Sequence, residues 1–113
     1  MDFNSYQKSA LTTATYPLLG SNMAYPALGL AGEAGEAADK VKKIWRNQGA
    51  VDSKQYTPEQ RLEIAKELGD VLWYIAALTS EMGYQLDTIA QMNIAKLLDR
   101  QKRGVIKSEG DNR

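Results

Sequence analysis

Paired carboxylates are the residues of this sequence whose type and spacing could do chemistry. Glu33 and Glu36 form one pair, and Glu67 and Asp70 form another, each three positions apart. On a helix, residues three apart share a face, with their Cβ atoms roughly 5–6 Å apart. If the two helices are neighbours, the four carboxylates converge at the edge of the core.

Converging carboxylates repel one another, by roughly 3 kcal/mol for two charges about 5 Å apart at an effective dielectric of 20. A bound cation would relieve that repulsion. The sequence has no histidine and no cysteine, so the ligands of a metal would be oxygens, which points to Mg²⁺, Mn²⁺ or Ca²⁺. Acid pairs with this spacing also occur on solvated helix faces, so each pair taken alone is weak evidence.

Each acid pair also encloses a glycine, Gly35 in the first and Gly69 in the second. A glycine inside a helix costs about 1 kcal/mol relative to alanine. We therefore expect a close approach of a backbone or a ligand at these two positions.

A second group of polar residues lies between positions 86 and 103. Asn93, Lys96, Arg100 and Arg103 follow helical spacing and share one face. Cations on one face can hold phosphate oxygens, although positive charge near a helix C-terminus is also favourable without any ligand. Tyr74, one turn after Asp70, is a candidate to stack on a base; Trp45 and Trp73 are others, and core packing is the alternative for all three.

Helix-breaking residues divide the chain into four helical segments, predicted at about 2–16, 26–47, 58–82 and 86–103. No segment alternates as a strand does, so we predict an all-α, four-helix-bundle-type protomer. The predicted domain spans residues 1–104, and residues 105–113 form a flexible tail. Val71–Leu78 is apolar or aromatic on every side, which predicts a partner subunit because three other short helices can hardly cover it.

Composition excludes several classes of protein. The 113 residues suit one domain. Basic and acidic residues number 14 each, and this balance argues against a broad nucleic-acid surface. There is neither a signal peptide nor a long apolar run, so we expect a cytoplasmic protein that does not bind membranes.

The two acid motifs and their surroundings resemble the ExxE…ExxD signature of MazG-like nucleotide pyrophosphohydrolases. The resemblance extends over Gly29–Glu36, over Glu67–Tyr74 and over Asn93 to Gly104. It implies the all-α NTP pyrophosphatase fold, related to all-α dUTPases, in a homodimer or homotetramer. It also implies that (d)NTPs are hydrolysed to a monophosphate and pyrophosphate, as nucleotide-pool housekeeping.

The resemblance also implies that Glu33, Glu36, Glu67 and Asp70 bind Mg²⁺, or Mn²⁺ in its place. For such a site we assign the other roles ourselves: Glu33 or Glu36 would accept a proton from the attacking water. Lys96 first, and then Arg100 or Arg103, would contact the phosphates, and Asn93 and Tyr74 the sugar and base. The preferred base stays open.

Two other functions fit parts of the sequence. A non-catalytic dimeric helical adaptor, which binds a protein, would need no metal and would expose an apolar groove. A carboxylate-bridged di-iron bundle is a weaker alternative, because it normally requires a histidine three residues after a glutamate and this chain has none.

Overall fold

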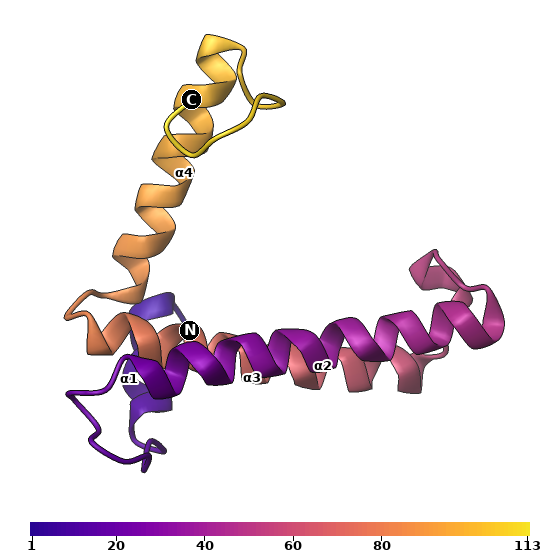
Figure 1. The fold of residues 1–113 in the computed structure, drawn as a ribbon, viewed down its shortest axis with the longest axis horizontal. Coiled ribbons are helices and arrows are strands. Elements are labelled where there is room, and N and C mark those ends of the chain that lie inside the picture. The colour runs from indigo at the N-terminus through magenta and orange to yellow at the C-terminus, as the bar shows by residue number, and fades with distance from the viewer.

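The protein is built from helices alone in the computed structural model, which describes residues 1–113 (Figure 1). The four α-helices and one short 3₁₀ turn are α1 (Phe3–Leu11), α2 (Ala24–Gln48), η1 (Ser53–Gln55), α3 (Pro58–Glu81) and α4 (Leu86–Arg103). The predicted all-α class is confirmed. No helix is both long enough and apolar enough to cross a membrane.

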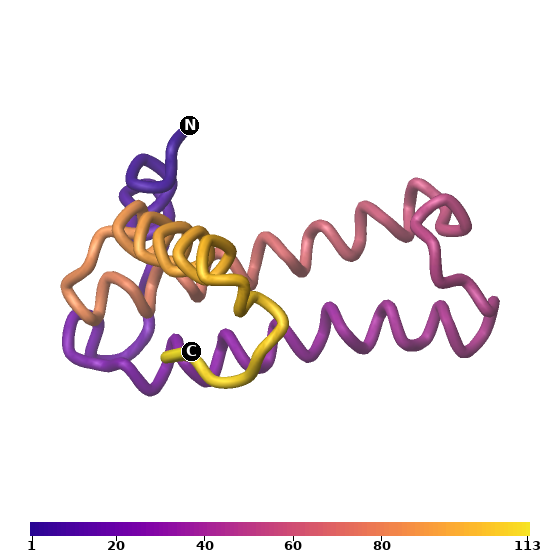
Figure 2. The backbone as a smooth tube through the Cα atoms, turned by 90° about the horizontal axis from the view of Figure 1, so that it is seen from above, coloured from indigo at the N-terminus to yellow at the C-terminus, as the bar shows by residue number.

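Helices α2 and α3 form a long antiparallel hairpin, side by side in both views (Figures 1 and 2). Helix α2 ends at Gly49, whose left-handed φ of 66° suits glycine. Helix α3 begins as predicted, because Thr57 Oγ1 accepts a hydrogen bond from the Gln60 amide at 3.1 Å and the Gln60 side chain accepts one from the Thr57 amide at 2.9 Å. These local signals fix where the hairpin turns.

Helix α1 is shorter than the predicted segment 2–16, since it ends at Leu11. The Thr12 and Thr13 hydroxyls donate hydrogen bonds to the carbonyls of Ser9 and Ala10, at 2.6 and 2.7 Å. Threonine hydroxyls compete in this way with the helical backbone pattern. The apolar residues that follow are buried against α3 from an irregular segment rather than from a helix.

The core is small and lies where α1 crosses the end of the hairpin. One cluster joins α1, α3 and the start of α4, and consists of Ala10, Ala76 and Leu86. A second cluster consists of Ala14, Tyr16 and Ala77, and Trp73 packs against both clusters. Within Val71–Leu78, only the two alanines are buried and no residue is fully exposed. The need for a partner to cover this segment therefore stays a prediction.

Helix α4 leaves the hairpin at a steep angle, so the folded chain is open (Figures 1 and 2). Its radius of gyration is 16.9 Å, whereas a compact chain of this length has about 13 Å. Residues 105–113 turn back on α4, where Asp111 Oδ1 lies 2.7 Å from Lys96 Nζ and 3.0 Å from Arg100 Nη2. Within this segment, the Arg113 guanidinium donates to the carbonyls of Val105, Ile106 and Gly110. The structure thus gives the tail a defined contact, while its predicted mobility is a separate property that stays a prediction.

Candidate metal and nucleotide site

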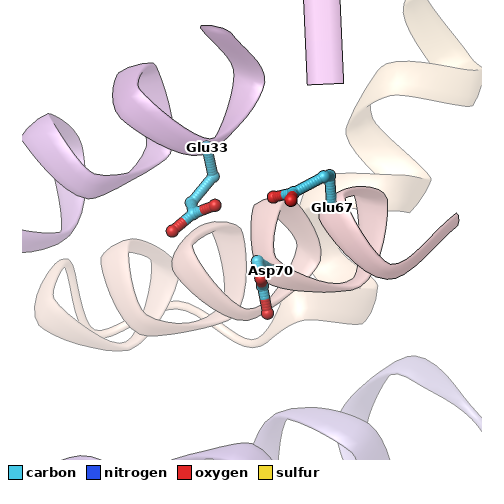
Figure 3. Close-up of side chains that lie close together, drawn as sticks. All are labelled: Glu33, Glu67 and Asp70. Carbon is cyan, nitrogen blue, oxygen red and sulfur yellow. The ribbon is translucent and has the colours of Figure 1, made fainter. Parts of the chain in front are cut away.

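Three carboxylates converge between the two helices of the hairpin. Glu33 extends from α2 toward the part of α3 that carries Glu67 and Asp70 (Figure 3). One oxygen from each residue lies within 4.8 Å of the other two. We call Glu33, Glu67 and Asp70 the acidic trio. Helical spacing places Glu67 and Asp70 on one face of α3, and the antiparallel packing of α2 brings Glu33 opposite them.

The environment of Glu33 favours a cation. Its Oε2 atom is inaccessible to solvent and has no hydrogen-bond partner. Burial is the main cause that raises the pKa of Glu33, to about 6, and the negative charge of Glu36 is the second. A buried carboxylate oxygen without a donor is costly unless a positive charge satisfies it. The all-oxygen donor set of the acidic trio and this unsatisfied atom together fit a Mg²⁺ ion.

Glu36 lies outside the acidic trio. Its side chain is exposed, and it is close enough to act on both neighbours, because it raises the pKa of Glu33 and helps to lower the pKa of Glu67. Three of the four predicted metal ligands therefore converge, and the fourth stands beside them.

Sequence reasoning missed Lys40. Its Nζ lies 3.2 Å from Glu67 Oε1, and the hydrogen bond from Lys40 is the main reason that the pKa of Glu67 is lowered. The available signal was its position on α2, one turn after Glu36 on the same face.

The predicted close approach of a backbone at Gly35 and Gly69 does not occur within the chain, because a Cβ at either position would meet open space. The approach of a ligand there stays a prediction. Gly29 has this role instead: a Cβ there would lie 2.2 Å from the Tyr74 ring. Only glycine at position 29 lets the ring of Tyr74 rest on the backbone of α2.

A cavity of about 350 Å³ adjoins the acidic trio and is lined by Thr13, Glu33, Asp70, Trp73 and Tyr74. The indole N–H of Trp73 donates to Thr13 Oγ1 at 2.8 Å, and the Thr13 hydroxyl donates to a backbone carbonyl. These walls therefore offer aromatic surface more than free hydrogen-bond donors. Tyr74 lines the cavity, and its contact with the sugar or base stays a prediction.

Aromatic contacts and one acid hold the cavity wall in place. Tyr16 stacks on Tyr25 with ring centroids 4.9 Å apart, and Tyr25 in turn lies 6.5 Å from Tyr74. Glu81 accepts hydrogen bonds from the Tyr16 hydroxyl at 2.6 Å and from the Gly20 amide at 2.9 Å. Glu81 thereby fixes the irregular segment between α1 and α2 against α3. Trp45, by contrast, is largely exposed and lies about 18 Å along α2 from Glu33, at 1.5 Å per residue.

The predicted phosphate ligands lie on a different helix, α4, away from the hairpin that carries the acidic trio. Asn93 and Lys96 line a cavity of about 300 Å³ on α4, which shares no residue with the cavity at the acidic trio. Lys96 Nζ lies 2.7 Å from Asp111 Oδ1, and Arg100 Nη2 lies 3.0 Å from the same atom. Arg103 pairs with Asp99 at 2.8 Å. The carboxylate of Asp111 thus holds the two cations together, but the protomer does not bring them to the acidic trio.

Comparison with known proteins identifies the family of the domain. Residues 24–105 match the MazG nucleotide pyrophosphohydrolase domain, and they contain all four predicted metal ligands. The chain belongs to the MazG nucleotide pyrophosphohydrolase family. The family match indicates a domain of the nucleotide pyrophosphohydrolase type, and the all-helical fold of the chain is consistent with that family.

One curated relative matches over its whole length. It is the Gene 37 protein of Mycobacterium phage L5, 44% identical over 118 aligned positions that span both chains completely. Its name states no activity. No solved structure matches the chain.

Proposed function

We propose that this MazG-family protein hydrolyses (d)NTPs to (d)NMPs and pyrophosphate with the help of Mg²⁺. The observation that carries the proposal is the acidic trio, which includes a buried carboxylate oxygen that lacks any donor. Such a cluster is unfavourable by itself, and a divalent cation is the simplest group that makes it favourable.

The residues of the acidic trio would hold the ion, or Mn²⁺ in its place. Mg²⁺ bound there would withdraw charge from the α-phosphate and make a water molecule easier to deprotonate. Glu36 is a better proton acceptor than Glu33, because Glu33 would be engaged with the ion whereas Glu36 stands beside the acidic trio with an exposed carboxylate. The water oxygen then forms a bond to the α-phosphorus, and the bond to the bridging oxygen breaks as pyrophosphate leaves.

The cavity beside the acidic trio would receive the nucleoside. Its rings belong to Trp73 and Tyr74, which favour stacking over discrimination among base edges. Because the Trp73 N–H and the Thr13 hydroxyl are already bonded, we expect several bases to be accepted.

The β- and γ-phosphates would be bound by Lys96 and Arg100, and less directly by Arg103 and Asn93. Because α4 leaves its own hairpin, we propose that these residues come from a second copy of the chain in a homodimer, or in a homotetramer built from two dimers. In support, α4 exposes apolar side chains that an interface would cover, with Ile94 55% and Leu98 58% exposed.

Pyrophosphate release from a panel of NTPs and dNTPs, with Mg²⁺ and with EDTA, tests the proposal. We expect release only with the divalent ion. Glu59→Gln is a matched control, because Glu59 is an exposed acid of α3 outside the acidic trio. Absence of release from every nucleotide would favour the adaptor function instead.

A further inference from the structure

Lys40 provides the positive charge at the acidic trio. It projects from α2, and its Nζ lies 3.2 Å from Glu67 Oε1 and 3.6 Å from Glu63 Oε2. Glu67 has a side chain only 15% exposed, while that of Glu63 is 52% exposed. The ammonium therefore bridges one carboxylate of the acidic trio and one carboxylate outside it, one turn earlier on α3.

The ammonium of Lys40 contacts Glu67, a carboxylate that a metal ion at the acidic trio would also have to bind. An ammonium at hydrogen-bond distance from Glu67 uses a carboxylate that belongs to the trio, and two cations held by one carboxylate repel each other. The chain therefore has a built-in competitor for part of the metal site.

The structure also offers the ammonium another place. A groove of about 310 Å³ between α2 and α3 is lined by the side chains of Lys40, Glu59, Glu63 and their neighbours. Glu63 lies on the groove side rather than in the acidic trio. Its Oε1 atom pairs with Lys66 at 3.1 Å, and its other oxygen, Oε2, faces Lys40 at 3.6 Å and can accept the ammonium. Lysine has a flexible four-carbon side chain, so a small change of rotamer would move the ammonium group from Glu67 to Glu63.

We infer that Lys40 is a displaceable internal counterion of the metal site. Without metal, it neutralises Glu67 and keeps α2 and α3 aligned; when a divalent ion binds the acidic trio, Lys40 moves onto Glu63. This inference rests on the proposed metal-binding function. Lys40 is thus a positioning residue that lowers the affinity for Mg²⁺. In the metal-free protein, its charge reduces the repulsion among the carboxylates of the acidic trio.

A purely structural salt bridge makes a different prediction. Its loss would lower the melting temperature of the metal-free protein and leave the intrinsic Mg²⁺ affinity of the folded protein unchanged. The counterion inference requires both a lower melting temperature without metal and a tighter Mg²⁺ Kd.

Mg²⁺ titration of the full-length protein by calorimetry, without nucleotide, separates the two. We expect Lys40→Met, which keeps the aliphatic stem, to bind Mg²⁺ about fivefold more tightly than the wild type, about 1 kcal/mol at 1.4 kcal/mol per tenfold. Lys43→Met is the matched control, because Lys43 is a neighbouring lysine of α2 whose partner is Asp39, at 2.7 Å. Its Mg²⁺ Kd should equal that of the wild type.

The variant Glu63→Gln tests the second position of the ammonium and does not depend on the folding of Lys40→Met. With Glu63 neutral, Lys40 loses the one carboxylate outside the acidic trio that lies within ion-pair distance of it, so we expect Mg²⁺ binding to weaken about threefold, or 0.7 kcal/mol at the same conversion. In the Lys40→Met background, Glu63→Gln should have no such effect.

The outcomes distinguish this inference from the function on which it rests. Wild-type Mg²⁺ binding, with an unchanged or weaker Kd in Lys40→Met or an unchanged Kd in Glu63→Gln, would overturn the counterion role and leave the proposed metal site intact. Absence of Mg²⁺ binding by the wild type would overturn the metal site itself and the counterion role with it.

Discussion

The affinity of the acidic trio for Mg²⁺ should fall as the solution becomes acidic, because Glu33 must lose its proton to bind a cation. Burial and the charge of Glu36 raise the pKa of this carboxyl to about 6, from a reference value of 4.5. At pH 8, about 99% of Glu33 is ionised, and at pH 5 only about 9%. We therefore expect the Mg²⁺ Kd to be about tenfold weaker at pH 5 than at pH 8 through this group alone.

The neighbouring acid should not share this dependence. The hydrogen bond from Lys40 lowers the pKa of Glu67 below its usual value, so Glu67 stays ionised over most of the range from pH 5 to 8.

The folding stability of the metal-free protein should change with pH in the opposite direction to its affinity for Mg²⁺. Because the pKa of Glu33 is higher in the folded protein than in the unfolded chain, this group makes folding less favourable above pH 6, and the penalty fades as the pH falls toward 4.5.

Calorimetric titration with Mg²⁺ in buffers of different ionisation enthalpy measures both the Kd and the protons released. We expect about 0.9 proton released per ion at pH 5 and about 0.1 at pH 7. The variant Glu33→Gln is the control, since it should bind more weakly and with no proton release from this group. A Kd that is the same at pH 5 and pH 8, or no proton release at pH 5, would refute the assignment of Glu33 as a buried, metal-binding carboxylate.

Four other results are expected. Glu36→Gln and Asp70→Asn should each lower kcat by about 100-fold or more; a variant that keeps over a tenth of the wild-type kcat, a loss under about 1.4 kcal/mol, would remove that residue from the mechanism. Mg²⁺ at 100 times its Kd should stabilise the folded protein by about 2.7 kcal/mol, seen as a higher melting temperature that EDTA reverses. Dilution to nanomolar concentration in analytical ultracentrifugation should leave oligomers, and a folded, active monomer would contradict the shared site. Because Asp111 occupies Lys96 and Arg100, Asp111→Asn should lower the KM for triphosphates several-fold, and an unchanged KM would show that this ion pair does not compete with phosphate.

Much of the fold could be read from the sequence because its signals are local. The start of α3 depends on Thr57, Pro58 and Gln60, which lie within four residues of one another. Thr57 and Gln60 are joined by two hydrogen bonds, and Pro58 occupies the first helical position. The end of α2 depends on one glycine in a left-handed conformation. The acid pairs could likewise be placed on helix faces from spacing alone.

The end of α1 could not be predicted in this way. The apolar spacing of residues 3–14 suits a longer helix, but two threonine hydroxyls bond to the backbone and end it at Leu11. Which of these competing local bonds forms depends on the burial of Ala14 and Tyr16 against α3, which is a long-range contact.

The sequence by itself determined the all-helical class and the helices that carry the acids, and its lack of histidine and cysteine limits any metal site to oxygen ligands. Only the tertiary structure decided which carboxylates meet, because that depends on the rotation of α2 against α3. It joined Glu33 to Glu67 and Asp70, left Glu36 beside them and placed Lys40 on Glu67. It also carried the cations of α4 away from the acidic trio, since the direction of a helix after a turn is set by packing between distant segments and not by spacing along the chain.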